Sequence, residues 1–486
     1  MKKTRQKLAQ HSENKWAILA MLAVAQFMVV LDVSIVNVAL PSIAQELNFA
    51  PSNLQWVVTA YTLTFGGLLL LGGRAADLFG RRKLFIASVS LFAVASLVCG
   101  LAQTEMQLIL ARALQGLTAA FMSPVALSIV LSEFREGKER NKAMGVWAGV
   151  AAGGGAAGVL LGGVITQYLG WRWNFFVNVP IGLIVGMVAY ELLPRALGEE
   201  KQRPKLDLTG ALLATSGLMA LVYGLSRAPQ AGWSSTSVWQ FIIAGLVLLG
   251  AFIVNESRAK EPLMPLEIFK IRNVAGGNLA FLGIACSLFS MFFFLTLYLQ
   301  NVLGYSPVKA GLCFLPITFI IGGTAAIVSN LVGKIGYKPT LLLGPIALAS
   351  GLLTLSYTLK VNGTYWVDVF PGLALCALGM GLTFVSGTLA ATSGVPKHFS
   401  GLASGILNTS QQVGGALGLA IISAVAFTSV NDHMAKQLLD PLLAQVHGYQ
   451  DGLRVGAYLA LAAALAVLVL VKNHKADAHD ALSAGA

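Results

Sequence analysis

A single carboxylate stands inside the first long apolar stretch of the chain. Residues 16–41 read WAILAMLAVAQFMVVLDVSIVNVALP, and Asp32 is their one charged residue. About 20 apolar residues suffice to cross a bilayer as a helix, and an ionisable group within such a helix is costly and usually functional. A carboxylate that gains and loses a proton there could couple proton entry to another movement. We therefore predict that Asp32 is the proton-coupling group of a transporter.

Arg112 is the one basic residue deep within an apolar run, residues 107–131. Asp32 lies about nine residues before the outer end of its run, which is roughly 13 Å below the outer membrane surface at 1.5 Å per residue. Arg112 lies about two helical turns below the same surface. The long arginine side chain could span the difference in depth and pair with the carboxylate. Two alternatives remain open: Arg112 binds backbone carbonyls or Gln115 instead, or the pair serves structure alone.

Polar and adaptable side chains in the apolar runs are candidates for a substrate cavity. On a helical wheel, Gln26 and Asn37 fall near one direction, whereas Asp32 points more than about 100° away from them. We predict that Gln26 and Asn37 line the cavity while Asp32 faces a neighbouring helix. The alternative is that all of them bond to other helices. The further cavity candidates are Gln115, Met291, Phe292 and Gln411.

The elements that must position these residues are membrane helices. Of the 486 residues, 56% are hydrophobic and 11% are charged, and the mean hydropathy is +0.73. This composition excludes a soluble protein, which needs far more charge on its surface. Long apolar runs also exclude an outer-membrane barrel, whose strands alternate in hydrophobicity. We predict fourteen spanning helices, at residues 16–40, 54–73, 84–103, 107–131, 142–165, 174–193, 207–227, 237–257, 276–301, 307–329, 339–358, 366–391, 400–429 and 452–472.

The distribution of Lys and Arg predicts the orientation of these helices. Of the 33 basic residues, 26 fall in segments on the side of the N-terminus, six fall on the opposite side, and Arg112 lies within the membrane. Cytoplasmic loops carry the excess of Lys and Arg, so both termini are predicted to be cytoplasmic, in a multi-pass protein of the cell (inner) membrane. The same distribution explains the net charge of +12 without a nucleic-acid partner.

The loop after the second run carries the most specific pattern in the chain. Residues 73–83 read GRAADLFGRRK, which fits GxxxDxxGRR/K between two spanning helices. Gly73 would allow close helix approach, Gly80 a tight turn, and Asp77 a helix cap or an ion pair. We predict that Asp77 and the basic residues form a latch at the inner gate; the alternative is a loop that only sets topology. The basic members of the latch are Arg81 and Arg82.

A second segment with a similar but less complete pattern predicts an internal repeat. Residues 329–338 read SNLVGKIGYK, so that Gly80 corresponds to Gly336 and Arg82 to Lys338, while the aspartate is lost. Repeats of this kind are common among transporters. We predict three parts: a six-helix half at residues 1–193, an inserted two-helix segment at 194–273, and a second six-helix half with a cytoplasmic tail at 274–486.

With these motifs in place, the sequence resembles the major facilitator superfamily, in its fourteen-helix drug:proton antiporter branch (the EmrB/QacA type). Residues 73–83 match the family's motif A, residues 31–41 (LDVSIVNVALP) match the helix-1 motif of the branch, and residues 110–116 (LARALQG) match motif B. The resemblance covers essentially the whole chain. It implies alternating access by two rocking halves, export driven by proton entry, and a proton-relay role for Arg112.

The fifth run is dense in glycine and is similar to the antiporter motif C of the same branch. Its residues 158–163 read GVLLGG, and small residues at i, i+4 spacing let helices approach closely. The chain departs from the family at Val159, where the family commonly has a proline that bends the helix. The resemblance implies a role in antiport for Gly154, Gly158, Gly162 and Gly163.

Together these features predict proton-coupled efflux of hydrophobic, cationic drugs. A proton-coupled exporter of one antibiotic or metabolite is the main alternative, and Val159 keeps a proton symporter as another. We do not predict an enzyme, because the sequence has no phosphate-binding loop and its four cysteines and six histidines form no metal-binding pattern. No cofactor and no metal are expected. The expected partners are small-molecule drugs or metabolites, protons and the lipid bilayer, with a periplasmic adaptor if the cell is Gram-negative.

Overall fold

The computed structural model describes residues 2–134, 137–194, 206–396, 399–435 and 440–474. Within these residues, fourteen helices are long and apolar enough to cross a membrane, which confirms the predicted all-helical fold with fourteen spans. The elements in chain order are α1 (Lys2–Glu46), α2 (Trp56–Phe79), α3 (Arg81–Leu101), α4 (Glu105–Glu133), α5 (Lys138–Tyr168), α6 (Trp173–Phe176), α7 (Asn178–Leu192), α8 (Leu208–Ala231), α9 (Thr236–Arg258), the short η1 (Leu266–Lys270), α10 (Arg272–Leu297), the π-helix η2 (Tyr298–Val302), α11 (Pro307–Ile335), α12 (Tyr337–Thr358), the π-helix η3 (Tyr365–Val369), α13 (Phe370–Thr392), α14 (Ser400–Ala435) and α15 (Pro441–Leu470).

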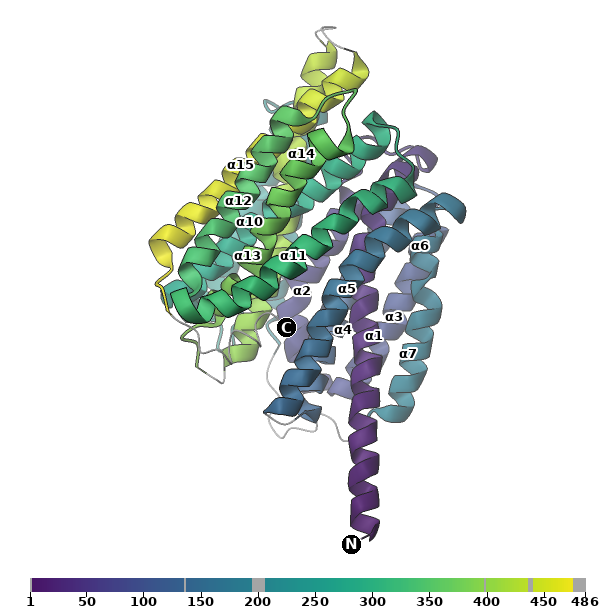
Figure 1. Ribbon diagram of the computed structural model, residues 1–486, viewed down its shortest axis with the longest axis vertical. Helices are drawn as coiled ribbons and strands as arrows, with labels where there is room; N and C mark the ends of the chain where they lie inside the picture. Colours follow the sequence, from purple (N-terminus) through teal and green to yellow (C-terminus); the bar gives the residue numbers. More distant parts are fainter. Residues whose placement is uncertain (1, 135–136, 195–205, 397–398, 436–439, 475–486) are drawn as a thin grey trace.

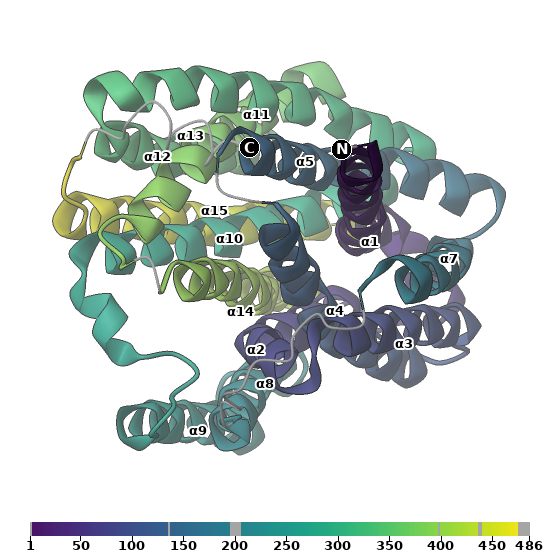
Figure 2. The same ribbon diagram turned by 90° about the horizontal axis from the view of Figure 1, so that it is seen from below.

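The helices form two bundles with a pair of helices beside them. Helices α1–α7 make one bundle and α10–α15 the other, and the two lie side by side along the long axis (Figure 1). Helix α8 packs on both bundles, against α2 and α14, and α9 covers α8 on its outer side (Figure 2). Trp56 of α2 donates to the Ser226 hydroxyl at 3.1 Å, and Asn431 of α14 donates to the Pro229 carbonyl at 2.7 Å.

The last two spans differ from the prediction at the end of the bundle opposite the N-terminus. The sequence analysis ends one span at residue 429 and begins the next at 452, whereas α14 continues to Ala435 and α15 begins at Pro441. Asp440 caps α15 by accepting from the Leu442 amide at 2.8 Å, and proline is favoured in the first helical turn. The first part of α15 is amphipathic: Val446 and Tyr449 are buried, and polar residues lie between and after them. The mean hydropathy of this segment is low, so the sequence analysis placed the start of the span too late.

Two helix–helix turns at the N-terminal end of the bundle show the predicted repeat. Gly80 joins α2 to α3 with φ +83°, and Gly336 joins α11 to α12 with φ +85°. After each glycine a basic side chain binds the end of the last helix of its bundle: Arg82 donates to the Tyr190 carbonyl at 2.5 Å, and Lys338 to the Leu468 carbonyl at 2.9 Å. Residues 80 and 82 of the first bundle therefore have the same backbone conformation and make the same kind of contact as residues 336 and 338 of the second.

The two bundles meet closely at only one end of the α5–α11 contact. A Cβ on Gly163 would stand 2.7 Å from the Pro307 carbonyl, and a Cβ on Gly311 would stand 2.7 Å from the Val159 carbonyl. Toward the N-terminal end, by contrast, Cβ atoms on Gly149 of α5 and on Gly322 and Gly323 of α11 would meet no atom within 4 Å. Figure 1 shows the same arrangement: α5 and α11 meet at the far end and diverge toward the end where α1 begins.

Candidate functional site

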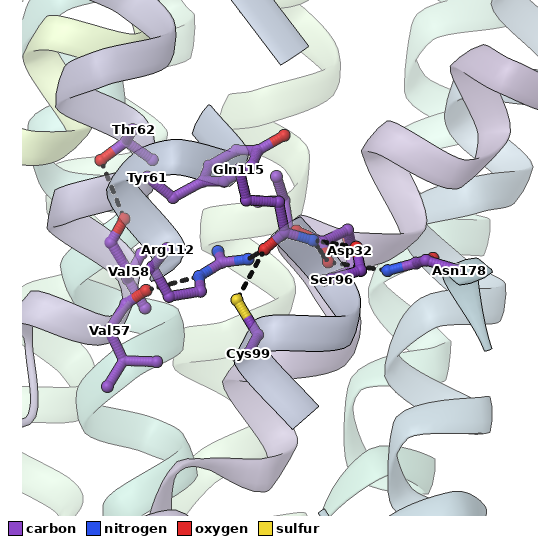
Figure 3. Close-up of polar contacts among 12 residues, drawn as sticks. Asp32, Val57, Val58, Tyr61, Thr62, Ser96, Cys99, Arg112, Gln115 and Asn178 are labelled. Carbon is purple, nitrogen blue, oxygen red and sulfur yellow. Dashed lines mark hydrogen bonds and ion pairs between the residues drawn. The ribbon is translucent and has the colours of Figure 1, made fainter. Parts of the chain in front are cut away.

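Asp32 lies near the middle of the membrane-spanning part of α1 and is completely buried. Its side chain points toward α4 and α7, as Figure 3 shows. Oδ2 accepts from Arg112 Nη1 at 2.6 Å, while Oδ1 accepts from Gln115 Nε2 at 2.7 Å and from Asn178 Nδ2 at 2.9 Å. The prediction that Asp32 faces neighbouring helices is confirmed, and so is its pairing with Arg112.

Arg112 donates hydrogen bonds to several groups at once. Besides Asp32, its Nε donates to the Val57 carbonyl of α2 at 2.9 Å and its Nη1 to Gln115 Oε1 at 2.6 Å. The guanidinium carbon lies 4.3 Å from the centre of the Tyr61 ring, close enough for a cation–π contact. The partners that the sequence analysis offered as alternatives to Asp32 therefore bind Arg112 together with it.

Gln115 belongs to this cluster and does not line a cavity in this structure, which corrects its predicted place. It follows Arg112 by one helical turn, so both side chains leave α4 on the same face. Its amide is fully buried, and Nε2 also donates to Ser96 of α3 at 2.7 Å. Three residues of the cluster, Tyr61, Ser96 and Asn178, were not foreseen, because nothing in one sequence says which polar residue of another helix meets Asp32.

The cluster is a buried ion pair held by neutral hydrogen-bonding groups. Arg112 is 1% exposed and Asp32 is fully enclosed. Two charges can be kept out of water only when their geometry is good and their remaining donors and acceptors are matched. Removal of one partner would leave the other charge buried without compensation, so both charges are needed for the contact between α1 and α4.

The remaining cavity candidates separate into two groups. Met291 is fully buried in the packing of α10 and does not reach open space, which corrects its prediction. Phe292 packs against the ring of Phe314, with the ring centroids 5.4 Å apart. Asn37 is half-buried and donates to the Val33 carbonyl of its own helix at 3.0 Å. Gln26, also half-buried, accepts from Ser123 of α4 at 3.0 Å.

Gln411 is the cavity candidate that does line a pocket. This pocket lies between α10, α13 and α14, and Phe281 and Phe384 form part of its wall. Its helix α14 packs against α2 of the other bundle, where a Cβ on Gly66 would stand 2.6 Å from the Gln412 Cβ. All of the residues that line the pocket belong to the α10–α15 bundle, and the residue next to Gln411 contacts α2 of the other bundle.

Near the end of α2, the structure shows that a different glycine makes the predicted close contact between helices. A Cβ on Gly73 would meet only Pro124 at 3.9 Å, an ordinary contact, whereas a Cβ on Gly72 would collide with the Ala120 carbonyl. The close approach of α2 to α4 thus occurs one residue earlier than predicted, on the adjacent face of the helix. Gly80 does form the predicted tight turn, with φ +83°. The side chain of Asp77 lies outside the described residues.

The basic residues of that loop contact two different parts of the chain. Arg81 is the first residue of α3, and Arg82 adds to its bond with the Tyr190 carbonyl a cation–π contact at 5.1 Å. Arg74, which the sequence analysis did not single out, donates to the Glu261 carbonyl at 2.7 Å and to the Pro262 carbonyl. The C-terminal end of α2 is thereby tied to the linker that follows α9.

The glycines of α5 form the interface with α1. A Cβ on Gly154 would stand 3.2 Å from Val30, one on Gly158 would stand 2.6 Å from the Ser34 Cβ, and one on Gly162 would stand 2.8 Å from the Ile35 carbonyl. These contacts flank Asp32 along α1, so the glycine row fixes the helix that carries the carboxylate. Gly163 faces α11 instead, and α5 is continuous through Val159.

Comparison with known proteins identifies the family. A family model described as Major Facilitator Superfamily matches residues 22–419. The chain is 38% identical to the puromycin resistance protein of Streptomyces alboniger, over 96% of this chain and 93% of the relative, and 41% identical to the cephamycin export protein of Amycolatopsis lactamdurans, over 84% of each. It is 33% identical to a multidrug resistance protein of Mycobacterium tuberculosis, over 88% of this chain and 80% of the relative.

Solved structures agree with this assignment at the level of the fold. The chain is similar to the peptide transporter POT in complex with sulfate, with a TM-score of 0.66 at 16% identity over 94% of this chain and 96% of that one. It is also similar to a bacterial homologue of the lysosomal transporter Spinster in an inward-facing and occupied conformation, with a TM-score of 0.63 at 16% identity over 93% and 96%. The chain therefore belongs to the Major Facilitator Superfamily, as a multi-pass membrane transporter of fourteen spans.

Proposed function

We propose that this transporter exports hydrophobic antibiotics and related drugs from the cell in exchange for protons. The observation that carries the proposal is the fully buried Asp32–Arg112 pair at 2.6 Å on the first and fourth spans. Relatives that cover nearly the whole chain bear the names of drug resistance and export proteins, which supports efflux as the direction of transport. Proton exchange, needing no cofactor, is our inference from the site.

In the proposed cycle, Asp32 is the group that takes up and releases the proton. As a carboxylate it accepts from Arg112, Gln115 and Asn178. A proton on either oxygen cancels its charge and turns that oxygen into a donor, so the ion pair with Arg112 is lost. Arg112 then rests on the Val57 carbonyl and Gln115, and the contact between α1 and α4 weakens.

Movement of the two bundles converts this local change into transport. The α5–α11 contact is closed at the far end and open toward the N-terminal end, which corresponds to one of the two states of alternating access. Because the α5 glycines pack on α1 on both sides of Asp32, a shift of α1 reaches this contact directly. We place the N-terminal end in the cytoplasm, from the predicted charge distribution, so this state would receive drugs from inside the cell.

An exporter dedicated to one antibiotic is the second candidate. Several relatives carry the name of a single drug, namely puromycin, cephamycin, lincomycin and tetracenomycin C, whereas one is named for multidrug resistance. The two candidates share the Asp32–Arg112 site and the mechanism, and they differ only in the range of drugs that the substrate cavity accepts.

A resistance panel tests the proposal and separates the candidates. The chain and its Asp32→Asn variant are expressed in a drug-sensitive bacterium, and growth is measured with each of the four drugs just named and with ethidium. Efflux predicts resistance that disappears in the variant while the protein remains in the membrane. Resistance to one drug alone selects the dedicated exporter, and sensitivity to every compound at normal membrane expression contradicts efflux.

A further inference from the structure

Two carboxyl groups meet where α8 begins and α9 ends. Glu256 lies in the last turn of α9 and is 3% exposed, and Asp207 is the N-cap of α8. The two carboxyl groups lie within hydrogen-bonding reach of each other. A Cβ on Gly210 would stand 2.6 Å from Asp207 Oδ2 and 2.7 Å from Glu256 Oε1, so the glycine leaves the room that both oxygens need beside α8.

The hydrogen-bond donors around this pair leave one of its four oxygens unmatched. Asp207 accepts from the Gly210 amide on Oδ1 at 2.8 Å and from Asn255 Nδ2 on Oδ2 at 2.7 Å. Glu256 accepts from the Met264 amide on Oε2 at 2.8 Å, whereas its Oε1 has no donor among the described residues. A buried carboxylate oxygen without a donor is costly, and it becomes a donor itself once it binds a proton.

Charged neighbours do not compensate a second negative charge at the pair. Neither carboxyl group makes an ion pair with a described residue. Arg258 of α9 and Lys260 and Glu261 of the linker are exposed, and Arg74 of α2 donates to the Glu261 and Pro262 carbonyls. A metal ion would need several free oxygen ligands, whereas three of the four oxygens here already accept a hydrogen bond. Two carboxylates in contact repel, so only one of them can be ionised.

We propose that Glu256 and Asp207 bind one proton between them, as a second proton site that is separate from Asp32. Glu256 carries the proton on Oε1 and donates it to Asp207 Oδ2, so that every oxygen of the pair is matched. This inference goes beyond the proposed efflux, because it requires neither a drug nor the Asp32 cluster.

The bound proton fixes the linker that joins α9 to η1. Glu256 binds this linker at the Met264 amide, and Arg74 of α2 binds it two and three residues earlier, at the Pro262 and Glu261 carbonyls. Loss of the proton would place two negative charges side by side, and their repulsion would weaken the bond between Glu256 and Met264. The linker is therefore held while the proton is bound and released as the pH rises, which makes the attachment of α2 to the inserted helices depend on pH.

Amide hydrogen exchange in residues 259–266 of the purified protein in detergent tests this proposal. Glu256→Gln replaces Oε1 by an amide that always donates to Asp207, so this variant should keep the linker bound at every pH. Buried glutamic acids are known to keep their proton up to about pH 8–9. From about pH 6 to about pH 10, exchange in the unmodified chain should therefore rise from the rate of the variant to at least about tenfold above it. The held state binds one proton more than the released state, so its population falls by up to tenfold per pH unit.

Comparison of the proteins at equal pH removes the direct effect of pH on exchange, and two further variants make the result specific. Glu267→Gln changes a nearby carboxylate that is 87% exposed, and it should behave as the unmodified chain does. Asp207→Asn keeps a favoured N-cap and donates an amide N–H to Glu256 once Asn255 turns its own amide, so it should also abolish the dependence on pH. The infrared band of protonated carboxyl groups at about pH 6 should be smaller by one group in Glu256→Gln than in Glu267→Gln.

Three results would overturn the proposal. The first is exchange in the unmodified chain that equals exchange in Glu256→Gln over the whole range, and the second is suppression of the rise by Glu267→Gln as well. The third is faster exchange at about pH 6 after treatment with a chelator, because the pair would then hold a metal ion instead of a proton. None of these results involves drug export, so each leaves the proposed efflux intact.

Discussion

Neutralising Asp32 alone should destabilise the protein far more than neutralising both charges of its pair. In Asp32→Asn, the guanidinium of Arg112 stays buried with only the Val57 carbonyl, Gln115 and the face of Tyr61 around it. Loss of one partner from a buried ion pair costs about 3–5 kcal/mol because the other charge is left uncompensated. Arg112→Gln should cost a similar amount, since it strands the carboxylate.

The double variant Asp32→Asn/Arg112→Gln removes both buried charges, so it should recover most of the stability that either single change loses. The interaction energy from the double-mutant cycle should reach about 2 kcal/mol or more, because contacting residues of one network are strongly non-additive. We would measure thermal unfolding of the purified protein in detergent and, for free energies, equilibrium unfolding in denaturant. The matched control is Arg454→Gln at the far end of the bundle.

Arg454 makes an ion pair with Asp451 at a similar distance, 2.8 Å, but the two side chains are 36% and 35% exposed. Such a pair contributes about 0–1 kcal/mol, because water screens both charges. The reasoning is refuted if Asp32→Asn costs no more than Arg454→Gln, or if the double variant is as unstable as the sum of the two single variants.

Two further predictions concern glycines, each paired with a nearby glycine as the control. Gly158→Ala should lower stability by about 1–3 kcal/mol, because its Cβ would stand 2.6 Å from the Ser34 Cβ, whereas Gly149→Ala, with no atom within 4 Å, should be neutral or stabilising. Thermal unfolding measures both, and equal losses would contradict the close contact of α5 with α1. Gly80→Ala should cost about 1–3 kcal/mol because its φ of +83° strains any residue with a Cβ, whereas Gly73→Ala should not, and an unchanged melting temperature in Gly80→Ala would count against the turn.

The sequence predicts the fold because long apolar runs and clustered basic residues leave few alternatives. Residue depth along a helix is fixed at 1.5 Å per residue, so the meeting of Asp32 with Arg112 could be anticipated from the chain alone. The direction in which a residue points around its helix axis is harder to predict from the sequence. Gly72 rather than Gly73 makes the close approach of α2, since neighbouring residues of a helix differ by about 100° in direction.

Contacts between helices set the limit of sequence-based prediction for the site. Gln115 was placed in a cavity but closes the Asp32 cluster, because the choice depends on which helix packs beside α4. Asn178 joins the cluster from the start of α7, well over a hundred residues along the chain from Asp32. The pairing of such distant polar residues is decided by the three-dimensional packing of the bundle, which periodicity along one helix does not report.

The measurement that tests the central claim most directly is the release of protons that a drug induces. Inverted vesicles are energised to form a pH gradient, which a fluorescent weak base reports, and the drug most strongly exported in the resistance panel is added. We predict that the gradient collapses with the unmodified protein and with Arg454→Gln. It should persist with Asp32→Asn and with the more stable Asp32→Asn/Arg112→Gln, although both variants still bind the drug. Collapse at the unmodified rate in either Asp32 variant would show that protons pass through another group and would contradict the account.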